Sequence, residues 1–186
     1  MERKAVSGVM LILLLTGMLT LVSNFQPAKS TWTGTVYIRA DGSIDPPDAP
    51  IHRDGNVYTL TGNITSSGDG IVVERDNIII DGAGYTLEGT GAYPYKGVDL
   101  SGRSNVTIKN TIITKFYYGI LLSSSSNNSI FGNNIANNGF GIGLGYSFNN
   151  NSIFGNNITA NKYDGIELYY SSNNIVCGNI HKAFAC

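Results

Sequence analysis

The sequence has little of what a metal centre or a nucleic-acid-binding surface needs. Its 186 residues include only two cysteines and two histidines, and no Cys-x-x-Cys pair occurs, which argues against a zinc site. Charged residues make up 13% of the chain and its formal net charge is −1, so there is no basic surface for nucleic-acid phosphates. Lysine and glutamate are scarce, whereas the 23 glycines and the many asparagines disfavour helices. This composition favours β structure with many turns.

Residues 1–30 have the pattern of an export signal. Arg3 and Lys4 precede an apolar run over residues 9–22, and the small residues Ala28 and Ser30 precede Thr31. The run is shorter than the roughly 20 residues that span a bilayer, so we expect cleavage, with an uncleaved membrane anchor as the alternative. In either case we expect the rest of the chain in an extracellular, cell-surface or periplasm-like space. About 156 residues then remain, which is enough for one domain.

A four-residue motif, Gly-(Ile/Val)-x-Leu, recurs along the second half of the chain. It begins at Gly97, Gly119, Gly141 and Gly165, at steps of 22, 22 and 24 residues. Each copy is followed by two further short apolar stretches, so one period holds three short strands. Such a repeat is too short to bury its own core and must stack on its neighbours. The spacing predicts an all-β solenoid of triangular coils, with about 22–24 residues and three strands per coil.

An asparagine stands five residues after the leucine of each motif. Because strand residues alternate in direction, the Ile and Leu of each motif point inward and the residue between them points outward. In stacked coils the asparagines would form a ladder of side-chain amides, and the same residue type also suits a left-handed turn. Both interpretations apply to the same set, which comprises Asn105, Asn127, Asn149 and Asn173.

The two ends of the chain depart from the repeat. Residues 31–69 lack the period, and we interpret them as an N-terminal cap with the first strands, followed by coils over residues 70–180. Residues 181–186 form a stub that stops about half way round a coil. Because an uncovered β edge invites aggregation, we expect either a truncated reading frame, which we favour, or another subunit that covers the open end.

The repeat resembles a known family. The pattern Gly-Ile-x-Leu-x-x-Ser-x-Asn-x-x-x-Ile, as in residues 119–131, resembles the NosD-type right-handed parallel β-helix repeat of the pectin-lyase-like group, and residues 76–87 resemble that family's opening coils. The resemblance covers residues 57–180 and implies a right-handed β-helix. The group contains carbohydrate-binding proteins and sugar hydrolases, and the family name implies periplasmic copper binding. A fold alone does not decide between these functions.

Copper would need thiolate, thioether or imidazole ligands. All three methionines lie within residues 1–30, and the two histidines are far apart in the sequence. The only conceivable cluster is formed by Cys177, His181 and Cys186. We therefore expect no metal and no cofactor, and copper handling stays as an alternative function.

A glycosidase needs two carboxyl groups about 5–9.5 Å apart. The outward position of the motif carries Asp99 and Glu167, which would lie three coils apart, about 14 Å at the spacing of paired strands. Asp164 and Glu167 are the nearest acidic pair, and we interpret them as solvated side chains without a catalytic role. We assign no catalytic residue and expect no enzyme activity, with a polysaccharide lyase or hydrolase as the alternative.

Aromatic residues surround the motif, which favours binding over catalysis. Rings one coil apart, edged by amides and hydroxyls, can together contact sugar faces, although packing for stability is the favoured interpretation for any single ring. We expect the partner to be a glycan or an envelope component. The candidate contact residues are Tyr95, Tyr117 and Tyr163, which stand two before the glycine, together with Phe131 and Phe154.

Five Asn-x-Ser/Thr triplets are candidate glycosylation sites in an exported protein. They begin at Asn63, Asn105, Asn127, Asn150 and Asn157. Because Asn105 and Asn127 belong to the expected ladder, Asn63 and Asn157 are the better candidates.

Overall fold

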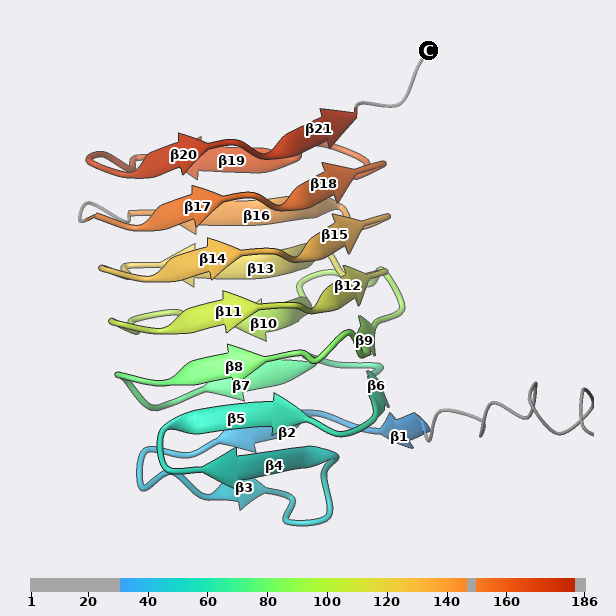
Figure 1. Cartoon of the computed structure of the whole chain (residues 1–186). Coiled ribbons are helices and arrows are strands. Elements are labelled where there is room, and N and C mark those ends of the chain that lie inside the picture. The colour runs from blue at the N-terminus through green and yellow to red at the C-terminus, as the bar shows by residue number, and fades with distance from the viewer. Residues whose placement is uncertain (1–30, 147–149, 183–186) are drawn as a thin grey trace, which may run out of the picture.

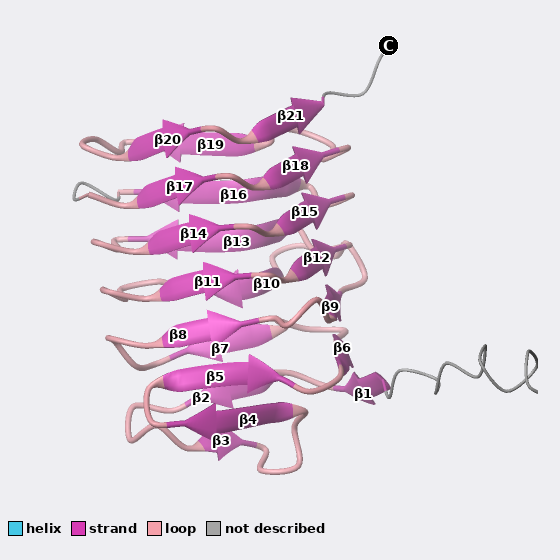
Figure 2. Ribbon diagram, viewed as in Figure 1, coloured by secondary structure: helices cyan, strands magenta, loops and turns pink. Residues whose placement is uncertain are grey.

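The computed structural model describes residues 31–146 and 150–182, and these fold into one parallel β-helix of about five turns (Figures 1 and 2). The described residues form strands and turns without helices, so none of their segments is a helix able to cross a membrane. The predicted all-β, right-handed parallel β-helix is confirmed. The predicted signal or anchor, residues 1–30, lies outside the described residues.

The coil passes in turn through three sheets of seven strands each. Sheet A contains β1 (Thr31–Thr33), β6 (Asn63–Thr65), β9 (Thr86–Glu88), β12 (Ile112–Thr114), β15 (Asn134–Ala136), β18 (Asn157–Thr159) and β21 (Ile180–Lys182). Sheet B contains β3 (Ile44–Asp45), β2 (Val36–Ile38), β7 (Ile71–Val73), β10 (Lys96–Asp99), β13 (Tyr118–Ser123), β16 (Phe140–Gly145) and β19 (Ile166–Tyr169). Sheet C contains β4 (Ile51–Asp54), β5 (Val57–Leu60), β8 (Ile79–Asp81), β11 (Thr107–Lys109), β14 (Ser129–Phe131), β17 (Ser152–Phe154) and β20 (Ile175–Cys177).

Parallel pairing in register stacks equivalent residues of successive coils. The inward column of the repeat motif runs Ile71, Val98, Ile120, Ile142 and Ile166. All but the last are fully buried, and each buried aliphatic side chain stabilises the fold by about 1.5–3 kcal/mol. The core therefore consists of aliphatic columns that run along the helix axis.

The two ends of the described helix differ. At the N-terminal end, β3 and β4 pair antiparallel with β2 and β5 and close sheets B and C. At the other end, β19, β20 and β21 form the last coil (Figure 1). There Leu168 and Val176 continue the inward columns of Leu144 and Ile153, and they are 52% and 39% exposed. That another subunit covers this end of the helix stays a prediction.

The predicted buried asparagine ladder is present, and it occupies three corners of the coil, whereas the repeat predicts it at one. At each step one side-chain Oδ1 accepts hydrogen bonds from the backbone N–H and the Nδ2 of the equivalent asparagine in the preceding coil. The Nδ2 also donates to a backbone carbonyl of an earlier coil, so the amides satisfy corner groups that would otherwise be buried without partners. The three columns are Asn128–Asn151–Asn174, Asn133–Asn156–Asn179 and Asn138–Asn161.

The structure places this ladder one residue beyond the predicted positions. Asn105, Asn127 and Asn173 are exposed and have φ of 54°, 55° and 58°, so they form the left-handed turns between sheets B and C. Asn105 makes one exposed amide contact, because its Nδ2 donates to Asn77 Oδ1 at 3.0 Å. Asn149 lies outside the described residues.

Candidate functional site: the outer face of sheet B

The outer face of sheet B is hollowed over its last three strands. Residues that point outward from β13, β16 and β19 form the column Leu121, Gly143 and Glu167. Gly143 has no side chain to fill its place in this column. The result is an open hollow of about 280 Å³ lined by Tyr118, Leu121, Gly143, Leu144, Gly145, Glu167 and Tyr169.

The ring of Tyr118 lies across Gly143. A Cβ on Gly143 would lie 2.8 Å from Tyr118 Cε1, closer than carbon atoms can approach without displacement. The ring also stacks on Phe140 of the next coil, with centroids 5.0 Å apart and planes 19° apart. Glycine at position 143 thus permits Tyr118 to lie flat along one wall of the hollow.

Tyr118 and Glu167 bring a hydroxyl and a carboxylate into the hollow. The Tyr118 hydroxyl donates to Glu167 Oε2 at 3.4 Å across two coils. Burial of the ring, followed by the negative charge of Glu167, raises the pKa of Tyr118 to about 12. Tyr118 therefore stays protonated near neutral pH. Its one O–H donates to Glu167, so the pair offers a ligand acceptor sites on the phenol and carboxylate oxygens.

A cluster of rings borders the hollow where the strands of sheet B begin. Tyr117 lies at its centre, with its ring centroid 4.9 Å from Tyr93, 5.7 Å from Phe140 and 6.3 Å from Tyr163. Phe140 and Tyr163 are 5.0 Å apart, and Tyr163 is 51% exposed. These edge-on and tilted contacts hold the rings in place while leaving the outer ones accessible.

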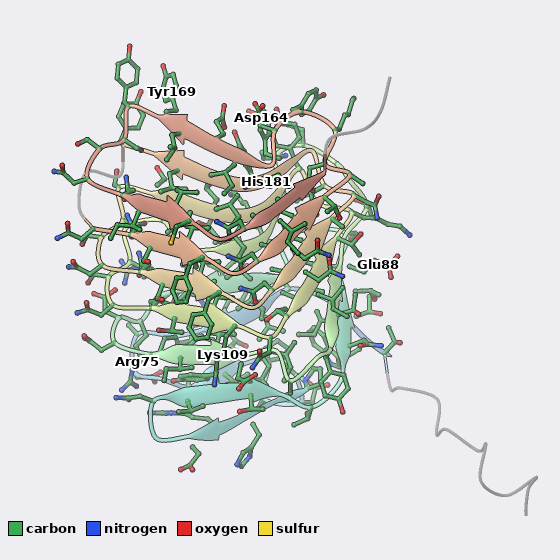
Figure 3. The ribbon with its side chains drawn as sticks, turned by 45° about the horizontal axis from the view of Figure 1, so that its top comes forward. Arg75, Glu88, Lys109, Asp164, Tyr169 and His181 are labelled. Atoms are coloured by element: carbon green, nitrogen blue, oxygen red, sulfur yellow. The ribbon has the colours of Figure 1, made fainter. Side chains whose placement is uncertain are left out.

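A second group of rings borders the hollow where these strands end. The centroid of Tyr146 lies 5.6 Å from those of both Tyr169 and Tyr170, which are 4.5 Å from each other. All three are at least half exposed. Figure 3 labels Tyr169 together with Asp164, which lies just before the opposite end of β19. The hollow is therefore bordered by aromatic side chains on both sides.

The predicted aromatic residues separate into two places. Tyr117 and Tyr163 lie in the cluster on sheet B, where Tyr93 makes the ring contact to Tyr117. Tyr95 is 36% exposed, and its carbonyl accepts hydrogen bonds from the backbone N–H groups of Tyr117 and of Tyr118, the first residue of β13. Phe131 and Phe154 stack 5.0 Å apart on sheet C and are distinct from this face.

The acidic residues of the repeat do not converge as a glycosidase pair. Asp99 is separated from Glu167 by two intervening coils in the outward column, and it pairs with Lys96 at 3.2 Å. Asp81 belongs to sheet C, where its carboxylate lies 3.0 Å from Lys109 Nζ. Burial alone would raise the pKa of Asp81, but hydrogen bonds from the Ala83 N–H and from Lys109 outweigh it and lower the pKa. The Asp81–Lys109 pair joins two adjacent coils, whereas the Lys96–Asp99 pair lies within β10.

The donors for a metal ion are dispersed. Across residues 31–146 and 150–182, no group of three or more His, Cys, Asp or Glu side chains is placed to hold a metal ion. His52 lies on β4 at one end of the helix, whereas Cys177 on β20 and His181 on β21 belong to different sheets at the other end. Cys186 lies outside the described residues. The described donors therefore do not fit a copper centre.

The fold and this face define a class of protein, namely a parallel β-helix that offers a hollowed, aromatic-edged sheet as its candidate ligand surface. Residues 33–183 match the model of a family described as periplasmic copper-binding protein (NosD). The chain belongs to this family. No curated protein matches the chain, and no solved structure matches it. The family description is periplasmic, which agrees with an exported protein.

Proposed function

We propose that this protein is an exported, non-catalytic β-helix protein that binds glycans on the outer face of sheet B. The observation that carries the proposal is the hollow between two groups of exposed tyrosine rings, with the Tyr118–Glu167 pair inside it. We call this surface the aromatic face. It consists of the hollow and the two ring groups that contain Tyr163 and Tyr169.

The chemistry of the aromatic face suits a sugar. A pyranose ring presents C–H groups on its faces and hydroxyls around its edge, so it needs flat apolar surfaces together with a few fixed polar groups. Tyr163 and Tyr169 supply exposed ring faces. Tyr118 and Glu167 supply acceptor oxygens at a fixed separation for the hydroxyls of a sugar.

Binding is better supported than hydrolysis. Glu167 is the one carboxylate among the residues that line the hollow. A glycosidase needs a second carboxyl group on the opposite side of the scissile bond. The geometry therefore supports recognition of a glycan without cleavage.

Affinity electrophoresis in gels that contain soluble polysaccharides tests the proposal. Each exposed ring that stacks on a sugar contributes roughly 0.5–1.5 kcal/mol, so Tyr163→Ala and Tyr169→Ala should each weaken binding about 2- to 12-fold. Phe154→Ala is the matched control, because it removes an exposed ring from sheet C. Unchanged retardation of the two tyrosine variants, or an equal loss in the control, would contradict the proposal.

Copper handling is the second candidate, and the description of the family is the observation that favours it. The described cysteine and histidine side chains are dispersed, so we expect a titration of the mature chain with Cu(I) or Cu(II) to show no tight stoichiometric binding. Tight binding that Cys177→Ser or His181→Ala abolishes would favour the copper function instead.

A further inference from the structure

The exposed turns between sheets B and C carry a column of asparagines. Each has a left-handed backbone, with φ between 52° and 59°, and each side chain is exposed. Successive members are one coil apart and follow the helix axis. The column comprises Asn77, Asn105, Asn127, Asn150 and Asn173.

The left-handed turn accounts for an asparagine at each position of the column, but it does not account for the residue type two positions later. Left-handed turns favour asparagine at every member of the column. Two residues on, the first strand positions of sheet C point outward and are paired in register from coil to coil. At the two ends of the column this position is isoleucine, whereas at the three middle coils it is a hydroxyl residue. These five positions are Ile79, Thr107, Ser129, Ser152 and Ile175.

The three middle members are thus complete Asn-x-Ser/Thr triplets on one accessible ridge. Within the described residues, the side-chain amides of Asn127 and Asn150 make no hydrogen bond, in contrast to Asn63, whose Oδ1 accepts the Thr86 N–H at 3.0 Å. The placement of the buried ladder one residue further along removes the reason to expect Asn105 and Asn127 to be protected.

We propose that the column Asn105, Asn127 and Asn150 is a site of N-linked glycosylation. The donor is a sugar chain joined through its anomeric carbon to a lipid phosphate, as an exporting cell supplies it to a transferase. The asparagine Nδ2 forms a bond to the anomeric carbon, the bond from that carbon to the phosphate oxygen breaks, and the lipid phosphate leaves with the electron pair. The amide proton passes to a base of the transferase, and the outward hydroxyl two residues on is the second recognition element.

The turn that bears the column lies where sheet B passes into sheet C, beyond the strand ends of the aromatic face. The site is independent of the proposed glycan-binding function, because it concerns sugars attached to this protein rather than sugars it binds.

Peptide mass spectrometry of the mature protein from the cells that make it tests this proposal. We expect peptides that contain Asn105, Asn127 or Asn150 to carry the additional mass of a sugar chain. Treatment with an amidase that removes N-linked glycans should convert each modified asparagine to aspartate. Ser129→Ala should abolish the modification at Asn127 while leaving the turn asparagine in place. Ser123→Ala, an outward serine on sheet B that belongs to no such triplet, should leave it unchanged.

Two results would overturn the assignment. One is native protein in which all three asparagines are unmodified. The other is modification at Asn127 that persists in Ser129→Ala, because a sugar attached without the hydroxyl would not be recognised through this triplet. Neither result depends on whether the protein binds polysaccharides, so this proposal and the proposed function can fail separately.

Discussion

Replacing Asn133 by alanine measures how much one member of the buried ladder stabilises the β-helix. The side chain is 2% exposed, and its Oδ1 accepts the Thr111 N–H at 3.0 Å. Its Nδ2 donates to the carbonyls of Ile108 and Phe131 and to Asn156 Oδ1, each at 3.0 Å. One amide therefore joins three successive coils.

The alanine variant leaves at least one buried donor, the Thr111 N–H, and one buried acceptor, the Ile108 carbonyl, without this partner. Each such group costs about 1–3 kcal/mol, so we expect the free energy of unfolding to fall by about 2–5 kcal/mol. Urea unfolding, monitored by circular dichroism, measures this change as a shift in the denaturation midpoint at an unchanged m-value.

Asn134→Ala is the matched control, because the adjacent asparagine points outward and is exposed. We expect this control to change stability by less than about 0.5 kcal/mol. Equal stability of the two variants would refute the reasoning that the buried column, rather than asparagine content, holds the coils together.

Two further predictions concern packing and ionisation. Gly119→Ala should lower the free energy of unfolding by about 1–3 kcal/mol in the same assay, since its Cβ would lie 2.5 Å from a backbone carbonyl oxygen of the next coil. Gly145→Ala is the control and should leave the free energy of unfolding unchanged, because its Cβ would have no atom closer than 4.0 Å. The pKa of Tyr118 in the folded protein is raised to about 12, above the ordinary tyrosine pKa of about 10. The contribution of this shift to the free energy of unfolding is therefore fully present below about pH 10 and is lost as the pH rises through about 12. In a phenolate absorbance titration, Glu167→Gln should shift the deprotonation of Tyr118 to lower pH. It should not restore the ordinary tyrosine pKa, because burial is the larger cause of the shift. An unchanged Tyr118 titration in Glu167→Gln would contradict the contact between the two residues.

The period of the sequence was sufficient to predict the coil. The Gly-(Ile/Val)-x-Leu motif determines which residues point inward, and pairing in register then follows for β10, β13, β16 and β19. The N-terminal reversal was not predictable, because β3 and β4 share no period with the coils and their antiparallel pairing depends on contacts made only in the fold.

The position of the ladder could have been obtained from strand alternation. Asn127 and Asn128 are adjacent, and the motif spacing alone does not say which of them is buried. Ile130 points inward, so the residue two before it, Asn128, shares its direction and Asn127 does not. The same rule selects Asn133, two residues before the inward Ile135.

The aromatic face was only partly predictable. Alignment on the glycine found Tyr117 and Tyr163, which do come within ring contact. The contact between Tyr118 and Glu167 joins residues two coils apart across a glycine, and it depends on how the Tyr118 ring lies over Gly143. Side-chain orientation of this kind has no signal in the spacing of a repeat.

Hydroxyl-radical footprinting with and without the polysaccharide that most retards the protein tests glycan binding most directly, because it reports which side chains a ligand covers. We expect the sugar to reduce oxidation of Tyr163 and Tyr169 on the aromatic face and to leave Phe154 on sheet C unchanged. Protection of Phe154 alone, uniform protection of all three, or the absence of any polysaccharide that retards the protein would contradict the proposed function.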